Sequence, residues 1–453
     1  MNKYIILIPE ITLLFLSIVS FIYGVLRKKD NEIFFLGILT FLLPLLLMMV
    51  SSSSGEVIAG LIKTDEIVNI FRFLLLMTGF FILLLAYGEI KGRTERFAEF
   101  VFLLTIAVFG MNLMLLSNDL LLLYLSLETF SLSLYVLAGF FRGERRSVES
   151  GMKYFILGTL SSILLLASIA FFYAVTGTTS FDAFKTTEFK NITVLLSLIF
   201  LLASFAFKLS LVPFHAWAPD VYQGAPTSVT ALFSTAPKIA VFIALVKIFL
   251  SGAENIDSSG FIIILSSLSM IVGNILALRQ ADLKRMFAYS SVAHAGYISM
   301  AFLLMDEALL RSIIPYLIIY LFMNIGAFAV IMSIKNGENI YSFNGLNKIS
   351  PLLALSMTVI LFSLTGIPPT AGFIVKFNIF KNLFIAGYGG LVFLGLLMSI
   401  LSAFYYLRIV FYMYSEQMAN VTLLEGNTLN RHIAMVSMVV LLITGLFPNL
   451  ILL

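Results

Sequence analysis

The fold is decided by the stretch FKLSLVPFHAWAP, residues Phe207–Pro219, which interrupts a long apolar run. The run covers about 191–222, which is too long for one straight crossing, because an ~30 Å hydrocarbon layer needs about 20 helical residues. Proline removes a backbone donor and kinks or breaks a helix. We therefore predict a membrane-spanning helix that is broken at Pro213 and Pro219.

A second apolar run, about 350–385, is interrupted by TGIPPTAG at Thr365–Gly372 and should break at Pro368 and Pro369. Broken backbone inside a membrane is tolerated only where it is buried in protein or lines a cavity. The two breaks lie five spans apart, and corresponding interruptions in two halves are typical of inverted-repeat transporters. The alternative is that proline and glycine are simply common in membrane helices.

The composition indicates that most of the chain lies within a lipid membrane. Of its 453 residues, 60% are hydrophobic and 11% are charged, and the mean hydropathy is +1.05. A soluble domain carries far more charge. We predict an all-α polytopic membrane protein with about fourteen transmembrane helices and two inverted five-helix repeats, each containing a broken helix. The spans lie near 4–26, 33–53, 66–88, 97–116, 119–141, 148–176, 191–222, 226–251, 258–278, 282–304, 307–334, 350–385, 389–414 and 429–451.

The charges set a predicted orientation. The net charge is only +4, and lysine and arginine gather in short loops after odd-numbered spans, such as 27–29 and 142–146. This pattern favours topology signals over nucleic-acid binding, and it predicts that both termini lie outside the cell. The chain has no cysteine, which excludes cysteine-ligated iron–sulfur clusters and disulfides on it. Its three histidines lie far apart in sequence and predict no metal site.

Of the ionisable residues inside the predicted spans, the principal candidates are Glu128, Lys208, Lys238 and Lys376. An ionisable group at the bilayer centre costs roughly 2.5–3.5 kcal/mol on insertion scales, so it marks a functional site by default. The structural alternatives are a hydrogen bond between helices for Glu128 and snorkelling for Lys208. Lys247 lies near the end of its span, where snorkelling is the better account.

Four further residues are weaker candidates. Glu149 and Lys153 have helical i, i+4 spacing, which suits an ordinary intrahelical pair as well as a relay. His215 lies within the first break, and His294 lies among hydroxyl-bearing residues; each could be a packed histidine or a relay. Burial disfavours a charged lysine and a nearby carboxylate favours it, so a Glu–Lys pair can load and release a proton. Together these residues predict proton transfer.

Several stretches carry a resemblance to a known family. Phe207–Thr227, Ser234–Lys238, Ser290–Tyr297 and Gly366–Phe373 resemble signatures of subunit N of bacterial respiratory complex I. The superfamily also includes multisubunit cation/proton antiporters and membrane hydrogenases. The reading WAPD within VPFHAWAPDVYQGAP is similar to the N type, whereas sister chains carry WLPD. The sequence also ends without the long lateral helix of subunit L, as expected of an N type.

The resemblance implies a single membrane domain over 1–453, with inverted five-helix units at 97–251 (helices four to eight) and 258–414 (helices nine to thirteen). It assigns functional positions to Glu128, Lys208, Lys238 and Lys376, and secondary relay positions to Lys153 and His294. It implies proton translocation in the bacterial inner membrane, as a subunit of an NADH–quinone oxidoreductase. NADH, flavin, iron–sulfur clusters and quinone would be held by partner subunits, which include other antiporter-like chains, with no cofactor on this one.

Three other readings stay open at this point. One is a subunit of a multisubunit sodium/proton antiporter or of a membrane hydrogenase, which the neighbouring genes would distinguish. Another is a stand-alone solute permease, which would need a polar pocket at the breaks to bind its solute. The last is a structural spacer, which the insertion cost of buried charges disfavours.

Overall fold

The computed structural model describes residues 3–51, 54–91, 93, 96–185, 192–252, 258–415, 421–424 and 428–452. Within these residues, twelve helices are long and apolar enough to cross a membrane, by length and composition. The prediction of an all-α polytopic membrane protein is confirmed. The chain forms two compact units, Met1–Leu209 with Gly224–Ile256, and Ser210–Gln223 with Asp257–Leu453.

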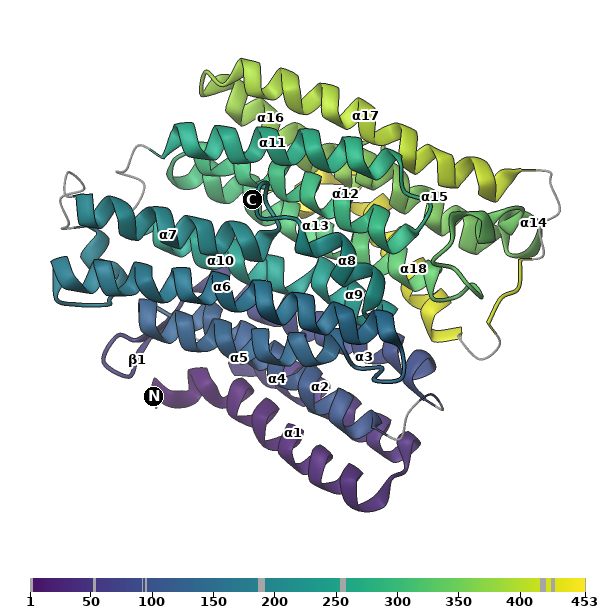
Figure 1. The fold of residues 1–453 in the computed structure, drawn as a ribbon, viewed down its shortest axis with the longest axis horizontal. Helices are drawn as coiled ribbons and strands as arrows, with labels where there is room; N and C mark the ends of the chain where they lie inside the picture. Colours follow the sequence, from purple (N-terminus) through teal and green to yellow (C-terminus); the bar gives the residue numbers. More distant parts are fainter. Residues whose placement is uncertain are drawn as a thin grey trace. The chain divides into compact units, whose positions relative to one another are not determined.

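The first unit is a bundle in which consecutive long helices run alongside one another (Figure 1). Its helical elements are η1 (Lys3–Leu7), α1 (Ile8–Arg27), α2 (Asp30–Ser51), α3 (Glu66–Ile90), α4 (Phe97–Leu116), α5 (Leu120–Ala138), α6 (Arg145–Thr176), η2 (Phe181–Lys185), α7 (Ile192–Leu209), α9 (Thr227–Ser234) and α10 (Ala236–Leu250).

The second unit is built in the same manner from the remaining helices. They are α8 (Trp217–Gly224), α11 (Ser259–Leu278), α12 (Leu283–Ser299), η4 (Met300–Leu303), α13 (Asp306–Ile331), η5 (Ile340–Phe343), α14 (Leu346–Ile349), α15 (Pro351–Thr365), α16 (Ala371–Ile385), α17 (Gly389–Tyr414), α18 (Thr428–Leu446) and η6 (Pro448–Leu450).

Helix starts follow from local capping chemistry. Asp65, Asp119 and Asp282 precede α3, α5 and α12, and each carboxylate accepts a hydrogen bond from a backbone amide of the first turn. The cap of α9 comes from another helix. Glu89 of α3 accepts from the Thr227 and Ser228 amides at 2.7 and 2.9 Å, and from the Ser228 hydroxyl at 2.6 Å.

Neighbouring helices approach closely where one of them carries glycine. A Cβ at Gly110 of α4 would lie 2.7 Å from the backbone nitrogen of Phe130 on α5. In the second unit, a Cβ at Gly273 of α11 would lie 2.7 Å from the backbone nitrogen of Ala293 on α12. Lipid tails are as apolar as leucine, so membrane helices gain from close van der Waals packing at small residues. These two contacts bring α5 and α12, which carry candidate residues, against their neighbours.

The predicted spans match the observed helices except at three places. The predicted span 282–304 is the 17-residue α12 followed by η4, and it is too polar to count among the twelve. The span 350–385 is two helices of 15 residues, α15 and α16. The span 226–251, predicted as continuous, is interrupted at Thr235 between α9 and α10.

A small hairpin precedes α3, in a region predicted to be loop. Strands β1 (Gly55–Val57) and β2 (Ile62–Thr64) pair antiparallel. Ile58, Ala59 and Gly60 in the turn all have positive φ, at 55°, 54° and 85°. Isoleucine and alanine rarely adopt this conformation, and the asparagine–glycine or aspartate–glycine pair typical of such turns is missing, so no sequence signal announces the hairpin.

Candidate proton-transfer site

The first predicted break is present. α7 ends at Leu209, and α8 begins at Trp217. Pro213 lies in the intervening loop, and Pro219 lies in the first turn of α8. Ser210, directly after α7, takes the left-handed conformation with φ 61°.

The short helix α8 is held by polar contacts within the second unit. Arg285 of α12 donates to Asp220 at 2.6 Å and to Gln223 at 3.1 Å. Gln223 in turn donates to Asp282 at 2.9 Å. The helix that follows the break is therefore held in place within the second unit.

Lys208 is a buried cation at the end of a half-helix. Its residue is 4% exposed and lies in the last turn of α7. The ammonium donates to the Ser131 hydroxyl at 2.9 Å and to the Tyr135 hydroxyl at 3.2 Å, both on α5. The carbonyl end of a helix carries partial negative charge, which stabilises a nearby cation. Neutral oxygens and a helix terminus, rather than a carboxylate, hold this lysine.

Glu128 lies on α5, one turn before Ser131, and is half-buried. Its Oε1 atom is buried and has no hydrogen-bond partner in the described part of the chain. It forms no ion pair with Lys208 among the described residues, where the lysine donates to hydroxyls instead. The pair anticipated from the sequence is thus not formed in this structure, and Ser131 and Tyr135 hold the lysine instead.

Lys238 lies in the first turn of α10 and is 2% exposed. It directly follows the α9–α10 interruption, which sequence reasoning missed; Pro237 was the available signal, since proline is favoured at the start of a helix. The positive end of the α10 dipole faces this lysine, the opposite of the situation at Lys208. The two buried lysines of the first unit therefore occupy electrostatically different places.

Lys376 joins the two halves of the second broken span. It lies on α16, is 4% exposed, and donates to the carbonyls of Leu364 and Thr365 at 2.9 and 3.0 Å. Those carbonyls form the end of α15. The ammonium also lies 4.7 Å from the centroid of the Tyr297 ring. Gly366 takes φ 91°, and a Cβ there would lie 3.1 Å from Lys376 Cδ, so the lysine stem needs a glycine at this turn.

His294 and His215 differ sharply in their surroundings. His294 on α12 is 1% exposed, and tyrosine hydroxyls approach both of its ring nitrogens. His215 lies in the loop between α7 and α8 and is half-buried. Its Nδ1 is buried and finds no hydrogen-bond partner in the described residues.

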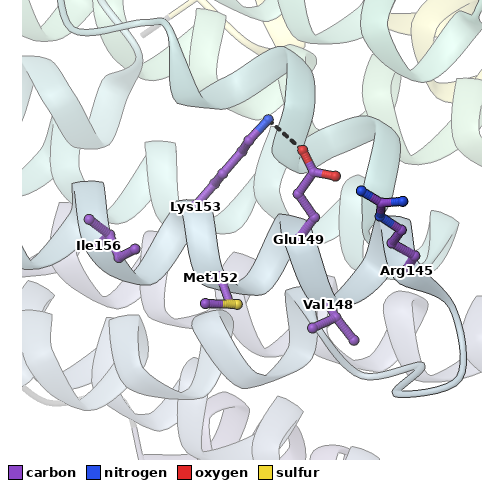
Figure 2. Close-up of a pocket in the computed structure, with 6 residues that line it drawn as sticks. All are labelled: Arg145, Val148, Glu149, Met152, Lys153 and Ile156. Atoms are coloured by element: carbon purple, nitrogen blue, oxygen red, sulfur yellow. Dashed lines mark ion pairs between the residues drawn. The ribbon is translucent and has the colours of Figure 1, made fainter.

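Glu149 and Lys153 line an open pocket on the surface of α6 (Figure 2). They form an ion pair at 2.8 Å, and their side chains are 53% and 41% exposed in the isolated chain. The pocket is completed by Arg145, Val148, Met152 and Ile156. α6 has 32 residues and is about 48 Å long, so it is longer than an ~30 Å hydrocarbon layer. An exposed intrahelical pair needs no relay role to explain it.

The fold and the buried cations define a class. A multi-span helical protein with two broken spans, each with a buried lysine at the carbonyl end of its first half, is an antiporter-like membrane subunit. Residues 117–402 match the family described as NADH:quinone oxidoreductase/Mrp antiporter, TM. The chain belongs to this family and, within it, to the antiporter-like N subunits of NADH-quinone oxidoreductase.

Individual relatives bear out this membership. A protein of Thermodesulfovibrio yellowstonii named NADH-quinone oxidoreductase subunit N 2 is 56% identical over 452 residues, which cover 100% of both chains. A chain of respiratory complex I from Thermus thermophilus is 32% identical with a TM-score of 0.87, covering 98% of each chain. A chain of the Mrp complex from Dietzia sp. DQ12-45-1b shares the fold, with a TM-score of 0.88 at 19% identity, and covers 100% of this chain and 96% of that one.

Proposed function

We propose that this chain moves protons across the bacterial inner membrane through Glu128, Lys208, Lys238 and Lys376, driven by electron transfer from NADH to quinone in partner subunits. The observation that carries the proposal is the setting of Lys208 and Lys376. Both are 4% exposed and lie beside helix breaks, and both donate to neutral oxygens. A lysine held in this way can lose its proton without leaving a stranded carboxylate behind.

The two halves of the transport path are proposed to be inverted five-helix units over 97–251 and 258–414. Each contains one broken span with a buried lysine: Lys208 lies in the last turn of α7, and Lys376 of α16 donates to the carbonyls that end α15. His294 and His215 are proposed as further relay groups. Glu149 and Lys153 are also proposed as relay groups, although their surface position suits a simple ion pair equally well.

The chain is proposed to carry no redox cofactor. NADH, flavin, iron–sulfur clusters and quinone would all lie on partner subunits, because the sequence has no cysteine and no nucleotide-binding glycine motif. The isolated subunit should show no flavin, haem or iron absorbance and no NADH oxidation. A bound redox group in the purified chain would contradict this division of labour.

The test of the function is proton uptake into vesicles that hold the complete complex, measured while NADH is oxidised. Lys208→Ala and Lys376→Ala should each strongly reduce proton uptake in assembled complex. Normal uptake in both variants would overturn the proposal. Uptake that required a sodium gradient and ignored NADH would instead favour a sodium/proton antiporter. Identifying the proteins that co-purify with the chain in mild detergent separates the same two cases.

Both termini are proposed to lie outside the cell, because the lysine and arginine clusters at 27–29 and 142–146 follow odd-numbered spans. A reporter fused after Arg145 should read as cytoplasmic. One fused after Glu254, which is outside the described residues, should read as external. Swapped readings would reverse the orientation.

A further inference from the structure

His294 is enclosed by hydroxyl groups. The Tyr316 hydroxyl of α13 lies 2.9 Å from Nδ1, and the Tyr406 hydroxyl of α17 lies 3.5 Å from Nε2. The histidine is 1% exposed, and the two tyrosines are fully buried. Three different helices of the second unit therefore meet at one imidazole ring, with one hydroxyl at each nitrogen.

The contact chain continues by one more group. Ser290, one turn before His294 on α12, hydrogen-bonds to the Tyr406 hydroxyl. The row thus reads Ser290, Tyr406, His294, Tyr316. On the other side of the histidine, the Tyr297 ring lies 5.9 Å from the imidazole, centroid to centroid, and it also carries the Lys376 ammonium on its face. The row therefore lies next to the buried lysine of the second break.

Each member of this row can accept one hydrogen bond and donate another. A hydroxyl has one donor and two acceptor positions, and a neutral imidazole has one donor nitrogen and one acceptor nitrogen. Such a row moves a proton by shifting every hydrogen by one bond. By contrast, a carboxylate at the end of a buried row would bind the proton more tightly, because protonation would neutralise the carboxylate's charge.

We propose that the hydroxyls of Tyr406 and Tyr316 are proton-relay groups on the two sides of His294, an inference that rests on the proposed function. A proton arriving from Ser290 bonds to the Tyr406 oxygen, and the Tyr406 hydrogen passes to Nε2. The hydrogen on Nδ1 then passes to the Tyr316 oxygen, and the Tyr316 hydroxyl passes its own hydrogen to a water molecule beyond the row. One proton enters and one leaves, the imidazole changes tautomer, and the ring and hydroxyls reorient before the next transfer.

The chain supplies a matched control beside each proposed relay residue. Tyr405 neighbours Tyr406, but its hydroxyl donates to Asn274 at 3.0 Å. Tyr320 lies one turn after Tyr316, and its hydroxyl donates to Ser291 at 3.1 Å. All four tyrosines are fully buried. Each Tyr→Phe change removes one buried hydroxyl, so general structural cost is similar across the set.

The experiment compares these variants in vesicles holding the complete complex, with assembled complex quantified first. Tyr406→Phe and Tyr316→Phe should lower the rate of proton transfer through this chain by roughly a hundredfold, the low end of the loss expected for one positioned proton-transfer group, and so slow NADH-driven proton uptake. Tyr405→Phe and Tyr320→Phe should retain it. Should one relay variant fail to assemble, the other decides the question alone.

A second comparison separates relay from packing. In a protein that already carries His294→Ala, the further change Tyr406→Phe should not lower proton uptake any more, because the relay is already interrupted at the histidine. If Tyr406 contributed only packing, its change would lower uptake further. Additive losses, or normal uptake in both relay variants, would overturn the inference. If Lys208→Ala and Lys376→Ala abolish uptake in that same assay, the proposed function stands while the relay fails; if they also leave uptake normal, the function fails.

Discussion

The amide of Gly372 on α16 donates a hydrogen bond to the Ser363 hydroxyl on α15 at 3.0 Å. A Cβ built at Gly372 would come within 1.7 Å of the Ser363 carbonyl oxygen. The two half-helices of the second broken span therefore touch backbone to backbone. This contact fixes the distance from Lys376, one turn further along α16, to the carbonyls at the end of α15.

Gly372→Ala is expected to separate the two half-helices. Overpacking of a tight site costs about 1–3 kcal/mol, and here the obstacle is backbone rather than a movable side chain. We expect less assembled complex and, in what assembles, weaker proton uptake. The matched control is Gly390→Ala on α17, where a Cβ would meet nothing within 4 Å. Equal amounts of complex from the two variants would contradict the expectation.

Glu128 and Lys208 are expected to behave as one unit in proton uptake. Glu128→Gln removes the carboxylate one turn before Ser131, which binds Lys208, and Lys208→Ala removes the proton carrier. Each change should depress uptake strongly, and the double change should cost little more than the worse single one. Lys63→Ala, at the exposed pair that Lys63 forms with Glu56, is the control and should have the smaller effect. Strictly additive losses would remove the pair from the pathway.

Lys376→Ala should impair proton uptake more than Lys247→Ala. Lys247 on α10 donates to the carbonyls of Leu115 and Ser117, both at 2.6 Å, at the end of α4. Its replacement leaves helix-end carbonyls without that donor, so the melting temperature of the complex should fall while transport persists. Comparable loss of transport at both positions would mean that Lys247 belongs to the path.

Arg72→Ala is expected to destabilise the first unit by about 3–5 kcal/mol, because it leaves a buried carboxylate without its cation. Arg72 and Glu10 are both 2% exposed, and their ion pair measures 2.6 Å. The control is Arg311→Ala, whose partner Glu307 is 75% exposed and whose loss should cost less than about 1 kcal/mol. Thermal unfolding in detergent measures both, and similar shifts would refute the distinction.

The apolar runs predicted most of the fold, because twenty apolar residues have few alternatives to a membrane helix. The two breaks were predictable as well, since Pro213 and Pro368 cannot continue a helix without losing a hydrogen bond. The interruption at Thr235 was missed, because Pro237 lies at the start of α10, where a proline is also compatible with a continuous helix after it.

Only the charged residues of the site could be predicted from the sequence. A lysine in an apolar run is conspicuous, so Lys208, Lys238 and Lys376 stood out. Tyr316 and Tyr406 did not, because a tyrosine in a membrane helix usually packs like any other aromatic residue. Their role depends on which helices meet at His294, and that meeting of α12, α13 and α17 is set by tertiary packing.

The carboxylate of Glu89 already occupies the amides of Thr227 and Ser228 at the start of α9. In many carriers with discontinuous helices, the exposed amide end of a half-helix is where an anionic solute docks. Here that position is filled by a side chain of the same protein, tied down by three hydrogen bonds. A substrate carboxylate or phosphate would have to displace Glu89 to bind there, so this end of the half-helix is closed to solute and suits a chain whose cargo is the proton.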